Sequence, residues 1–388
     1  MPTAPTHTPD SGSQSALPPP LPGVLVLAGL IVACAGLKSV SSIIGPVFLV
    51  LTLVITVQPL SASLIRRGVP RPVATVASLL MVYALLIIVL GSVVWSLTRL
   101  ATTLPDYAAQ FSTLYQQALA GLNSLGVSTE MLQQARSSLD LGSFAGIARS
   151  ALSGLSSGLS LLALIAAMVV FLVFDSVGFA ERVALIRTER PRIAAGLMDF
   201  AQSTRKYWIV TTIFGFIVAA LDVGALLIIG VPLAVTWGVL AFVTNYIPNI
   251  GFLLGLVPPA LIALLDGGVG RALAVVIVYT VINIVVQVLL QPRITGDAVG
   301  ITGTVAFLSL IFWAFILGPL GALLAVPSTL LVKSLLVDHS ETGHWFGALI
   351  NSSPTKASKQ KPLPIRTHHK TAGSTAVPAP PSPRRRST

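Results

Sequence analysis

Long runs of apolar residues constrain this fold more than any other feature of the sequence. Residues 72–98 and 303–332 contain no charged side chain, and a helix needs about 20 mainly apolar residues to cross the hydrocarbon core of a bilayer. Charged residues make up 10% of the chain and hydrophobic residues 54%, whereas about 25% of the residues in a typical soluble domain are charged. The sequence therefore predicts an all-α, polytopic helical membrane protein.

The apolar segments predict about eight transmembrane helices. They lie at residues 22–38, 42–62, 72–98, 153–174, 207–230, 269–291, 303–317 and 320–336. Residues 232–266 are treated separately, because two half-length apolar segments flank a polar stretch there. We expect these residues to form a re-entrant helical hairpin, which enters and leaves the membrane on the same side.

Composition divides the chain into five regions. The tails at 1–21 and 338–388 are rich in Pro, Ser and Thr and are expected to be disordered, because they cannot bury enough apolar surface to fold. Residues 22–98 hold transmembrane helices 1–3, and residues 99–150 form an expected extracytoplasmic amphipathic helical region. Transmembrane helices 4–8 and the hairpin lie within residues 151–337.

The distribution of basic residues predicts that both termini are cytoplasmic. If the hairpin also opens to the outside, eleven Lys and Arg residues between the tails fall on the cytoplasmic side and five on the outer side, the bias that cytoplasmic loops show. A polar segment at 175–206 then lies in the cytoplasm. The basic C-terminal tail could contact anionic lipid or nucleic acid, but we favour a solvated tail that helps to orient the chain, and we expect no nucleic-acid partner.

This orientation can be tested by labelling introduced cysteines in intact cells. A cysteine placed near residue 125 should react with a membrane-impermeant thiol reagent, and one placed near residue 360 should not, because the basic segments hold the tails inside. The opposite labelling pattern would invert the topology and move the mouth of the hairpin to the cytoplasmic face.

The polar stretch inside the expected hairpin has the sequence TNYIPNIG. Pro248 removes a backbone donor and prevents a continuous helix, and Gly251 allows the chain to reverse. Asn245 and Asn249 have amide groups that can cap helix ends or contact a solute. Broken helices survive in a membrane only inside protein or beside a watery cavity, so we place these residues and Tyr246 beside a transport pathway. Capping of the hairpin's own backbone is the alternative.

The helix after the hairpin carries a stripe of polar residues. Tyr279, Asn283, Gln287 and Gln291 recur at every fourth position and therefore share one face of an otherwise apolar helix. Polar side chains at membrane depth face protein or water. We include these four residues and the following Arg293 in the candidate pathway, with hydrogen bonding between helices as the alternative.

Asp222 is the one acidic residue well inside an expected span. An ionisable side chain at membrane depth is by default a candidate functional site. We expect Asp222 to take up a proton or cation that drives transport, and structural pairing with a polar neighbour is the alternative.

The sequence contains no pattern of a catalytic site. Its five histidines all lie outside the expected spans, and neither GxxxxGK[ST] nor HExxH occurs. ATP is therefore not expected to be the direct energy source. We predict no enzymatic activity, no catalytic residues, no metal site and no cofactor.

Four motifs occur in a fixed order along the chain. They are RRGVPRPVA at 66–74, TNYIPNIG at 244–251, QPRITGDAVG at 291–300 and FLSLIFWAFILGPLGALLAVP at 307–327. Together they resemble the autoinducer-2 exporter family over roughly residues 22 to 337. The resemblance implies a prokaryotic inner-membrane protein of about eight transmembrane helices, assembled as a homo-oligomer. It also implies transport, because members are associated with export of autoinducer-2 and some with sodium/proton antiport.

The expected function is therefore secondary export of a small polar solute such as autoinducer-2, either facilitated or coupled to an ion gradient. A sodium/proton antiporter is the first alternative. The second is a membrane scaffold or envelope-assembly protein that transports nothing, in which case the hairpin tip and the polar stripe would tolerate apolar replacement. Membrane lipids and the solute are the expected partners.

Overall fold

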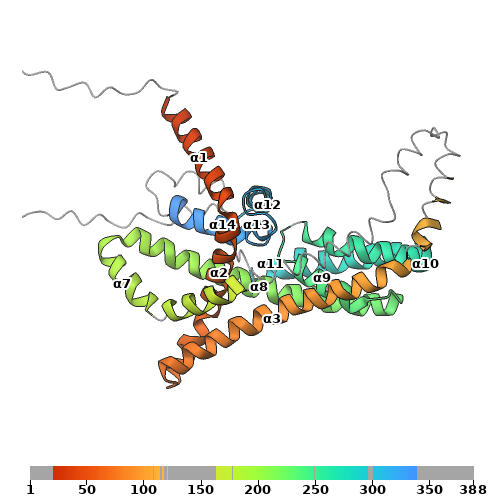
Figure 1. Ribbon diagram of the computed structural model, residues 1–388, viewed down its shortest axis with the longest axis horizontal. Helices are drawn as coiled ribbons and strands as arrows, with labels where there is room; N and C mark the ends of the chain where they lie inside the picture. Colours follow the sequence, from red (N-terminus) through yellow and green to blue (C-terminus); the bar gives the residue numbers. More distant parts are fainter. Residues whose placement is uncertain are drawn as a thin grey trace, which may run out of the picture.

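The computed structural model describes residues 21–107, 109–113, 116–117, 120, 163–176, 178–248, 250–295 and 300–338. Throughout this part of the chain the regular elements are helices (Figure 1). The two expected disordered tails, most of the expected amphipathic region at 99–150 and the start of the expected span at 153–174 lie outside the described residues.

The first three helices match the expected spans at 22–38, 42–62 and 72–98. They are α1 (Leu21–Ser39), α2 (Ser41–Arg66) and α3 (Arg71–Thr103), and α3 ends in a short 3₁₀ turn, η1 (Leu104–Tyr107). The turn between α2 and α3 contains Gly68, whose φ of 88° favours glycine. α1 projects from the rest of the molecule (Figure 1), and near its end the Lys38 Nζ lies 3.6 Å from the centre of the Phe315 ring.

The middle of the chain contains a longer helix than the sequence suggested. Residues 163–176 form a helix, and α7 (Phe179–Glu189) follows it at a bend of 65°. The chain then turns at Arg190 into α8 (Pro191–Ile229), whose first part packs against α7. The expected cytoplasmic segment at 175–206 is therefore not separate from the span after it, because no further proline interrupts the helix between Pro191 and its end at Gly230, where φ reaches 80°.

α9 (Ala234–Thr244) and the first half of α10 (Gly251–Asn283) form a helical hairpin at the expected position. Gly268, with φ 77°, breaks α10 into a first arm (residues 251–267) and a second arm (residues 269–283). The arms run antiparallel, since residues at the start of the first (Gly251 and Phe252) and at the end of the second (Asn283) line one small cavity. The second arm continues into a π-helical stretch, η2 (Ile284–Leu290), and α11 (Gln291–Thr295). Entry of the hairpin from one side of the membrane stays a prediction.

The remaining helices form another short hairpin. α12 (Gly303–Leu317) has the expected bounds, and the chain turns at Gly318, whose φ is 67°. The expected span at 320–336 is divided into α13 (Pro319–Leu323), α14 (Ala325–Val332) and a second π-helical stretch, η3 (Lys333–Val337).

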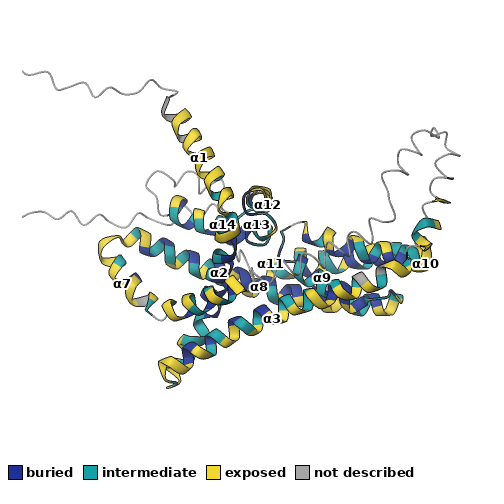
Figure 2. Ribbon diagram, viewed as in Figure 1, coloured by how far each residue is buried: buried dark blue, intermediate teal, exposed yellow. Residues whose placement is uncertain are grey.

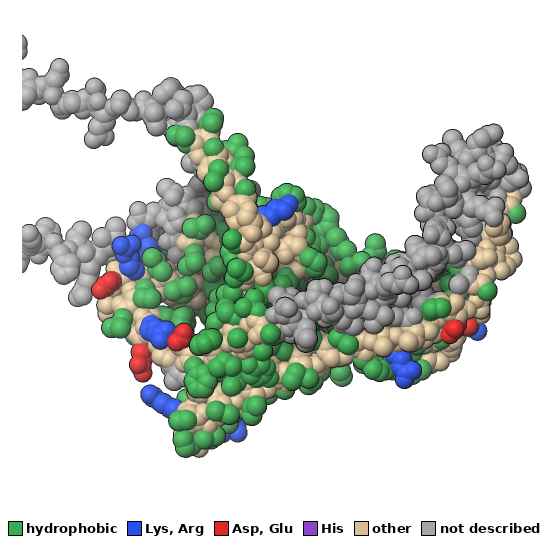
Figure 3. All heavy atoms as spheres, in the orientation of Figure 1, with side chains coloured by type: hydrophobic (Ala, Val, Ile, Leu, Met, Phe, Trp, Pro, Cys, Tyr) green, Lys and Arg blue, Asp and Glu red, His purple; other side chains and the backbone are tan. Residues whose placement is uncertain are grey.

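The described residues have the surface of a protein surrounded by lipid. Large apolar side chains are exposed on many helices, including Ile228 at 89%, Val32 at 71% and Ile88 at 69%, and α1 is exposed along most of its length (Figures 2 and 3). Four helices are long and apolar enough to cross a membrane, or up to five if the bent pair counts as one span. The fold is that of a polytopic helical membrane protein. The expected total of about eight crossings is reached only if the shorter apolar helices are counted.

Three buried clusters hold the described helices together, and the smallest joins α8 to η2 through Phe214 and Val286. The other two are larger. One joins α2, α3, the helix at 163–176, α8 and α14. The second large cluster joins the end of α8 with α9 and both arms of α10, around the fully buried Trp237. The Trp237 indole donates to the carbonyl oxygen of Pro232 at 3.0 Å, which ties the start of α9 to the turn that follows α8.

Candidate functional site

The tip of the α9–α10 hairpin is a compact turn held by its own backbone. The Ile247 amide donates to the Thr244 carbonyl at 2.8 Å, and the Gly251 amide donates to the Ile247 carbonyl at 3.0 Å. Pro248 has no amide hydrogen and ends the helical pattern at this point. A Cβ on Gly251 would overlap the Thr244 carbonyl oxygen. Gly251 is therefore required because the backbone passes so close, rather than for an unusual dihedral angle.

Tyr246 fixes this tip to α8. Its carbonyl accepts from the Tyr207 hydroxyl at 3.0 Å, and its own hydroxyl lies 2.7 Å from Thr212 Oγ1. The ring is 6% exposed and packs against Trp208 and Phe242, with ring centres 5.3 and 5.6 Å away. Tyr246 therefore anchors the turn.

Asn245 connects three elements at the same tip. Its Nδ2 donates to the Thr211 carbonyl of α8 at 3.3 Å, and its Oδ1 accepts from Gln287 Nε2 of η2 at 2.5 Å. The amide also lies against Gly215, where a Cβ would come within 2.6 Å of Nδ2. Asn245 is therefore held in place by α8 on one side and by the polar stripe on the other.

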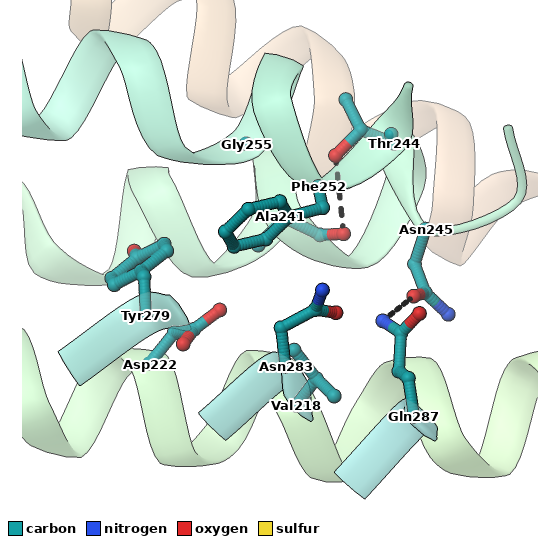
Figure 4. Close-up of a pocket in the computed structure, with 11 residues that line it drawn as sticks. Val218, Asp222, Ala241, Thr244, Asn245, Phe252, Gly255, Tyr279, Asn283 and Gln287 are labelled. Carbon is teal, nitrogen blue, oxygen red and sulfur yellow. Dashed lines mark hydrogen bonds between the residues drawn. The ribbon is translucent and has the colours of Figure 1, made fainter. Parts of the chain in front are cut away.

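Beside Asn245 lies a small cavity between α8, α9 and both arms of α10 (Figure 4). Its lining consists of Val218, Asp222, Ala241, Thr244, Asn245, Gly251, Phe252, Gly255, Tyr279, Asn283 and Gln287. The volume is about 10 Å³, which is room for roughly one water molecule. The site is therefore closed to any larger solute in this conformation.

Three oxygen atoms around this cavity are buried without a hydrogen-bond partner among the described residues. They are Asp222 Oδ1, the Tyr279 hydroxyl and Asn283 Oδ1. Asp222 and Tyr279 are each 2% exposed, and in Figure 4 their side chains lie next to each other. A buried polar atom without a partner costs about 1–3 kcal/mol, and a buried charge costs more. The cluster is thus suited to hold a proton, a small cation or a polar group of a solute.

The structure brings together six of the eleven residues that the sequence singled out: Asp222, Asn245, Gly251, Tyr279, Asn283 and Gln287 all line the cavity. Tyr246 and Pro248 shape the tip but are not part of the lining, and neither are Gln291 and Arg293. Asn249 lies outside the described residues. Within the lining, Asp222 alone carries a charge.

Sequence reasoning missed the residues that close the cavity. Phe252 and Gly255 come from the first arm of α10 and face the polar stripe across it (Figure 4). A Cβ on Gly255 would lie 3.2 Å from Thr244 Oγ1 and 3.3 Å from the Ala241 Cα, so the glycine permits close packing of the arm on α9. The only signal in the sequence was the spacing of four between Gly251 and Gly255.

Comparison with known proteins decides the family. A family model described as "AI-2E family transporter" matches residues 24–340. The chain belongs to the AI-2E transporter family. This match covers both hairpins and the cavity, and it agrees closely with the extent of the resemblance read from the four motifs.

Relatives in the AI-2E transporter family match most of this chain. The AI-2 transport protein TqsA of Escherichia coli is 32% identical over 316 residues, which is 81% of this chain and 91% of TqsA. The putative transport protein YhhT of Escherichia coli is 34% identical over 317 residues, with 80% and 88% coverage. A putative transport protein of Haemophilus influenzae is 26% identical, with 83% and 94% coverage. This chain is a multi-pass membrane protein of a transporter family with bacterial members.

The Asn245–Gln287 hydrogen bond should be measurable as a coupling energy. In a double-mutant cycle of Asn245→Ala and Gln287→Ala, we expect a coupling of about 0.6 kcal/mol and at most about 1.7 kcal/mol in the free energy of unfolding, the range found for side-chain hydrogen bonds between membrane helices. SDS titration of the purified protein supplies the measurement.

Asn283 supplies the matched control for this cycle. It lies on the same stripe, but its Oδ1 has no partner among the described residues, so Asn245→Ala with Asn283→Ala should give a coupling near zero. Equal coupling in both cycles would mean that the Asn245–Gln287 bond does not hold the tip.

Proposed function

We propose that this protein is a secondary transporter that exports a small polar solute between α8, the α9–α10 hairpin and the second arm of α10. The observation that supports it most directly is the cluster of buried, unpartnered oxygens around the closed cavity. A protein that used these helices only for packing would lose stability through each such atom. Membership of the AI-2E transporter family supports the same function.

The closed cavity supports an alternating mechanism. A passage with room for about one water molecule must widen to admit a solute. The contacts that close it are few: the Asn245–Gln287 hydrogen bond and the packing of Phe252 near the polar stripe. Glycines at both ends of the first arm, Gly251 and Gly268, are the places at which the arm could move as a unit.

Autoinducer-2 is the first solute to test. The relative TqsA is described as an AI-2 transport protein, and the lining combines amide and hydroxyl groups, which bind neutral polar solutes by hydrogen bonds. Asp222 supplies the coupling to an ion gradient, because a carboxylate that is 2% exposed needs a proton or a cation as partner when no cationic side chain faces it in the lining.

Sodium/proton antiport is the second candidate function. Asp222 Oδ1, Asn283 Oδ1 and the Tyr279 hydroxyl are oxygen ligands of the type that hard cations prefer. One carboxylate that binds either a proton or a cation, in turn, would be sufficient for exchange between the two.

The orientation and assembly follow the same proposal. Both termini are cytoplasmic, the membrane is the bacterial inner membrane, and the protein acts as a homo-oligomer. The basic residues within α7 and in the first half of α8 support this orientation.

Flux through proteoliposomes tests these functions together. The purified protein is reconstituted and the vesicles are loaded with autoinducer-2, with an imposed proton gradient, a sodium gradient or neither. Export above protein-free vesicles supports the transporter, and stimulation by one gradient identifies the coupling ion. Sodium-driven proton movement without any solute flux would favour the antiporter. Absence of both would support the scaffold.

A further inference from the structure

A second and much larger cavity lies between α7, the first half of α8 and α2. Its volume is about 500 Å³, and it is lined by Gln58 of α2, by Phe179, Val183, Ala184 and Arg187 of α7, and by Met198, Asp199, Ala201, Gln202 and Arg205 of α8. The residues from α7 and from α8 each recur at spacings of three and four, so each helix contributes one continuous face. The transport site uses none of these residues.

The cavity lies at the depth where the apolar spans end. In α8, Arg205 and Lys206 are the last charged residues before the apolar run that begins at Tyr207. In α2, Gln58 lies two turns before Arg66, with which the helix ends. Most of the charged side chains visible in Figure 3 lie around α7, and apolar side chains cover much of the neighbouring helices. This boundary between charged and apolar surface is the level of the lipid headgroups.

The lining has an excess of positive charge. Arg187 and Arg205 face one carboxylate, that of Asp199. Arg205 Nε donates to the Ile55 carbonyl at 3.3 Å, and this bond orients its guanidinium group. In the part of the chain that the structure describes, neither Arg187 nor Arg205 forms an ion pair. Arg205 is partly buried, whereas Arg187 is exposed where the cavity meets solvent, and an anionic partner would stabilise both guanidinium groups.

The walls between the two arginines are mainly apolar. Phe179, Val183 and Met198 contribute side chains from both helices, and Val183 is only 7% exposed. A free inorganic anion would leave this apolar surface uncovered. A molecule with a phosphate group next to hydrocarbon would satisfy both features, because arginine binds phosphate through paired N–H groups and the apolar wall can cover acyl carbons.

We propose that this cavity binds an anionic phospholipid. The lipid phosphate lies against Arg205 and Arg187, and the first carbons of its acyl chains lie along Phe179 and Met198. Basic pockets between membrane helices on the cytoplasmic side recognise anionic headgroups in this way. The proposal is independent of the transported solute and of the coupling ion.

Native mass spectrometry of the full-length protein in detergent tests this site. Phosphatidylglycerol is titrated against the wild type and against a variant with Arg187→Gln and Arg205→Gln, which keeps most of each side chain and removes both charges. We expect the variant to bind the first phosphatidylglycerol about tenfold more weakly, the scale of losing charge-assisted hydrogen bonds. A variant with Arg66→Gln and Arg67→Gln removes the same charge outside the cavity and should bind like the wild type.

Further measurements distinguish a lipid phosphate from a free phosphate and test whether the loss of binding comes from misfolding. Phosphatidylcholine should bind with little difference among the variants, and soluble glycerol phosphate should not displace phosphatidylglycerol. A variant with Arg187→Lys and Arg205→Lys keeps the charge and should recover most of the affinity. If the cavity variant and the Arg66/Arg67 variant lost the same affinity for phosphatidylglycerol, the binding site would not be this cavity. If glycerol phosphate displaced phosphatidylglycerol, the cavity would bind a phosphate group rather than a lipid.

Discussion

Gly251→Ala should destabilise this protein more than any other single added methyl group in the α9–α10 hairpin. The new Cβ would overlap the carbonyl oxygen of Thr244, which is backbone and cannot rotate away. Thr244 in turn is fixed by its place at the end of α9 and by the amide of Ile247, which donates to the same carbonyl at 2.8 Å. The turn must therefore open, at a cost of about 1–3 kcal/mol or more, and transport should fall with it.

Gly224 in α8 provides the matched control for this change. It is also a glycine in an apolar helix, but a Cβ there would meet no atom within 4 Å. Gly224→Ala should therefore be neutral or stabilise the protein by up to about 1 kcal/mol, because alanine favours helix more than glycine does. The free energy of unfolding by SDS titration and the solute flux are measured for both variants. If Gly251→Ala were as stable and active as Gly224→Ala, the close approach at the hairpin tip would be wrong.

The α9–α10 hairpin was predictable from the sequence only in part. A break was predictable at TNYIPNIG because Pro248 cannot continue a helix and the apolar segments on either side are too short to span a bilayer. The meeting of Asn283 and Gln287 with this break was predictable in part, because a spacing of four places them on one face. The role of Tyr246 was not predictable, because its partners Tyr207 and Thr212 come from a distant part of the chain.

The polar stripe also shows where periodicity misleads. A spacing of four predicts that Gln291 faces the same way as Gln287, but the intervening helix is π-helical from Ile284 to Leu290. Four residues in a π-helix still return to nearly the same face, and Gln287 lines the cavity from within this stretch. Gln291 and Arg293 lie at least one turn further along the helix and are not part of the lining. Stretches of this kind occur often at functional sites, and no residue type in IVVQVLL indicates one.

The full length of α8 was not predictable from the charge pattern. Charges in the segment at 175–206 suggested a separate cytoplasmic region, yet the helix from Pro191 continues into the membrane without a break. Charge and hydropathy report the environment of a residue, whereas continuity of a helix depends chiefly on the absence of proline between its ends. In α8 a charged first half and an apolar second half therefore belong to one helix.

Asp222→Asn should abolish transport driven by an ion gradient while leaving the protein folded. Asp222 is 2% exposed, its Oδ1 has no partner among the described residues, and Tyr279 and Asn283 are its polar neighbours in the cavity. Asparagine has nearly the same shape but can neither release a proton nor neutralise a cation. We expect the gradient-driven flux to fall at least about tenfold, the effect of about 1.4 kcal/mol, and the stability to stay unchanged or rise, because a buried carboxylate is costly.

Asp266→Asn is the matched control for this prediction. Asp266 lies at the other end of the same hairpin, where it forms an ion pair with Arg271 beside the Gly268 turn, and it does not line the cavity. Surface ion pairs contribute about 0–1 kcal/mol, so this variant should retain nearly full ion-driven flux. Solute movement down its own gradient separates the roles further. If the Asp222→Asn variant keeps passive flux but loses the response to ions, Asp222 is a coupling residue. An unaltered ion response would remove Asp222 from the mechanism and leave it as a buried polar residue beside Tyr279.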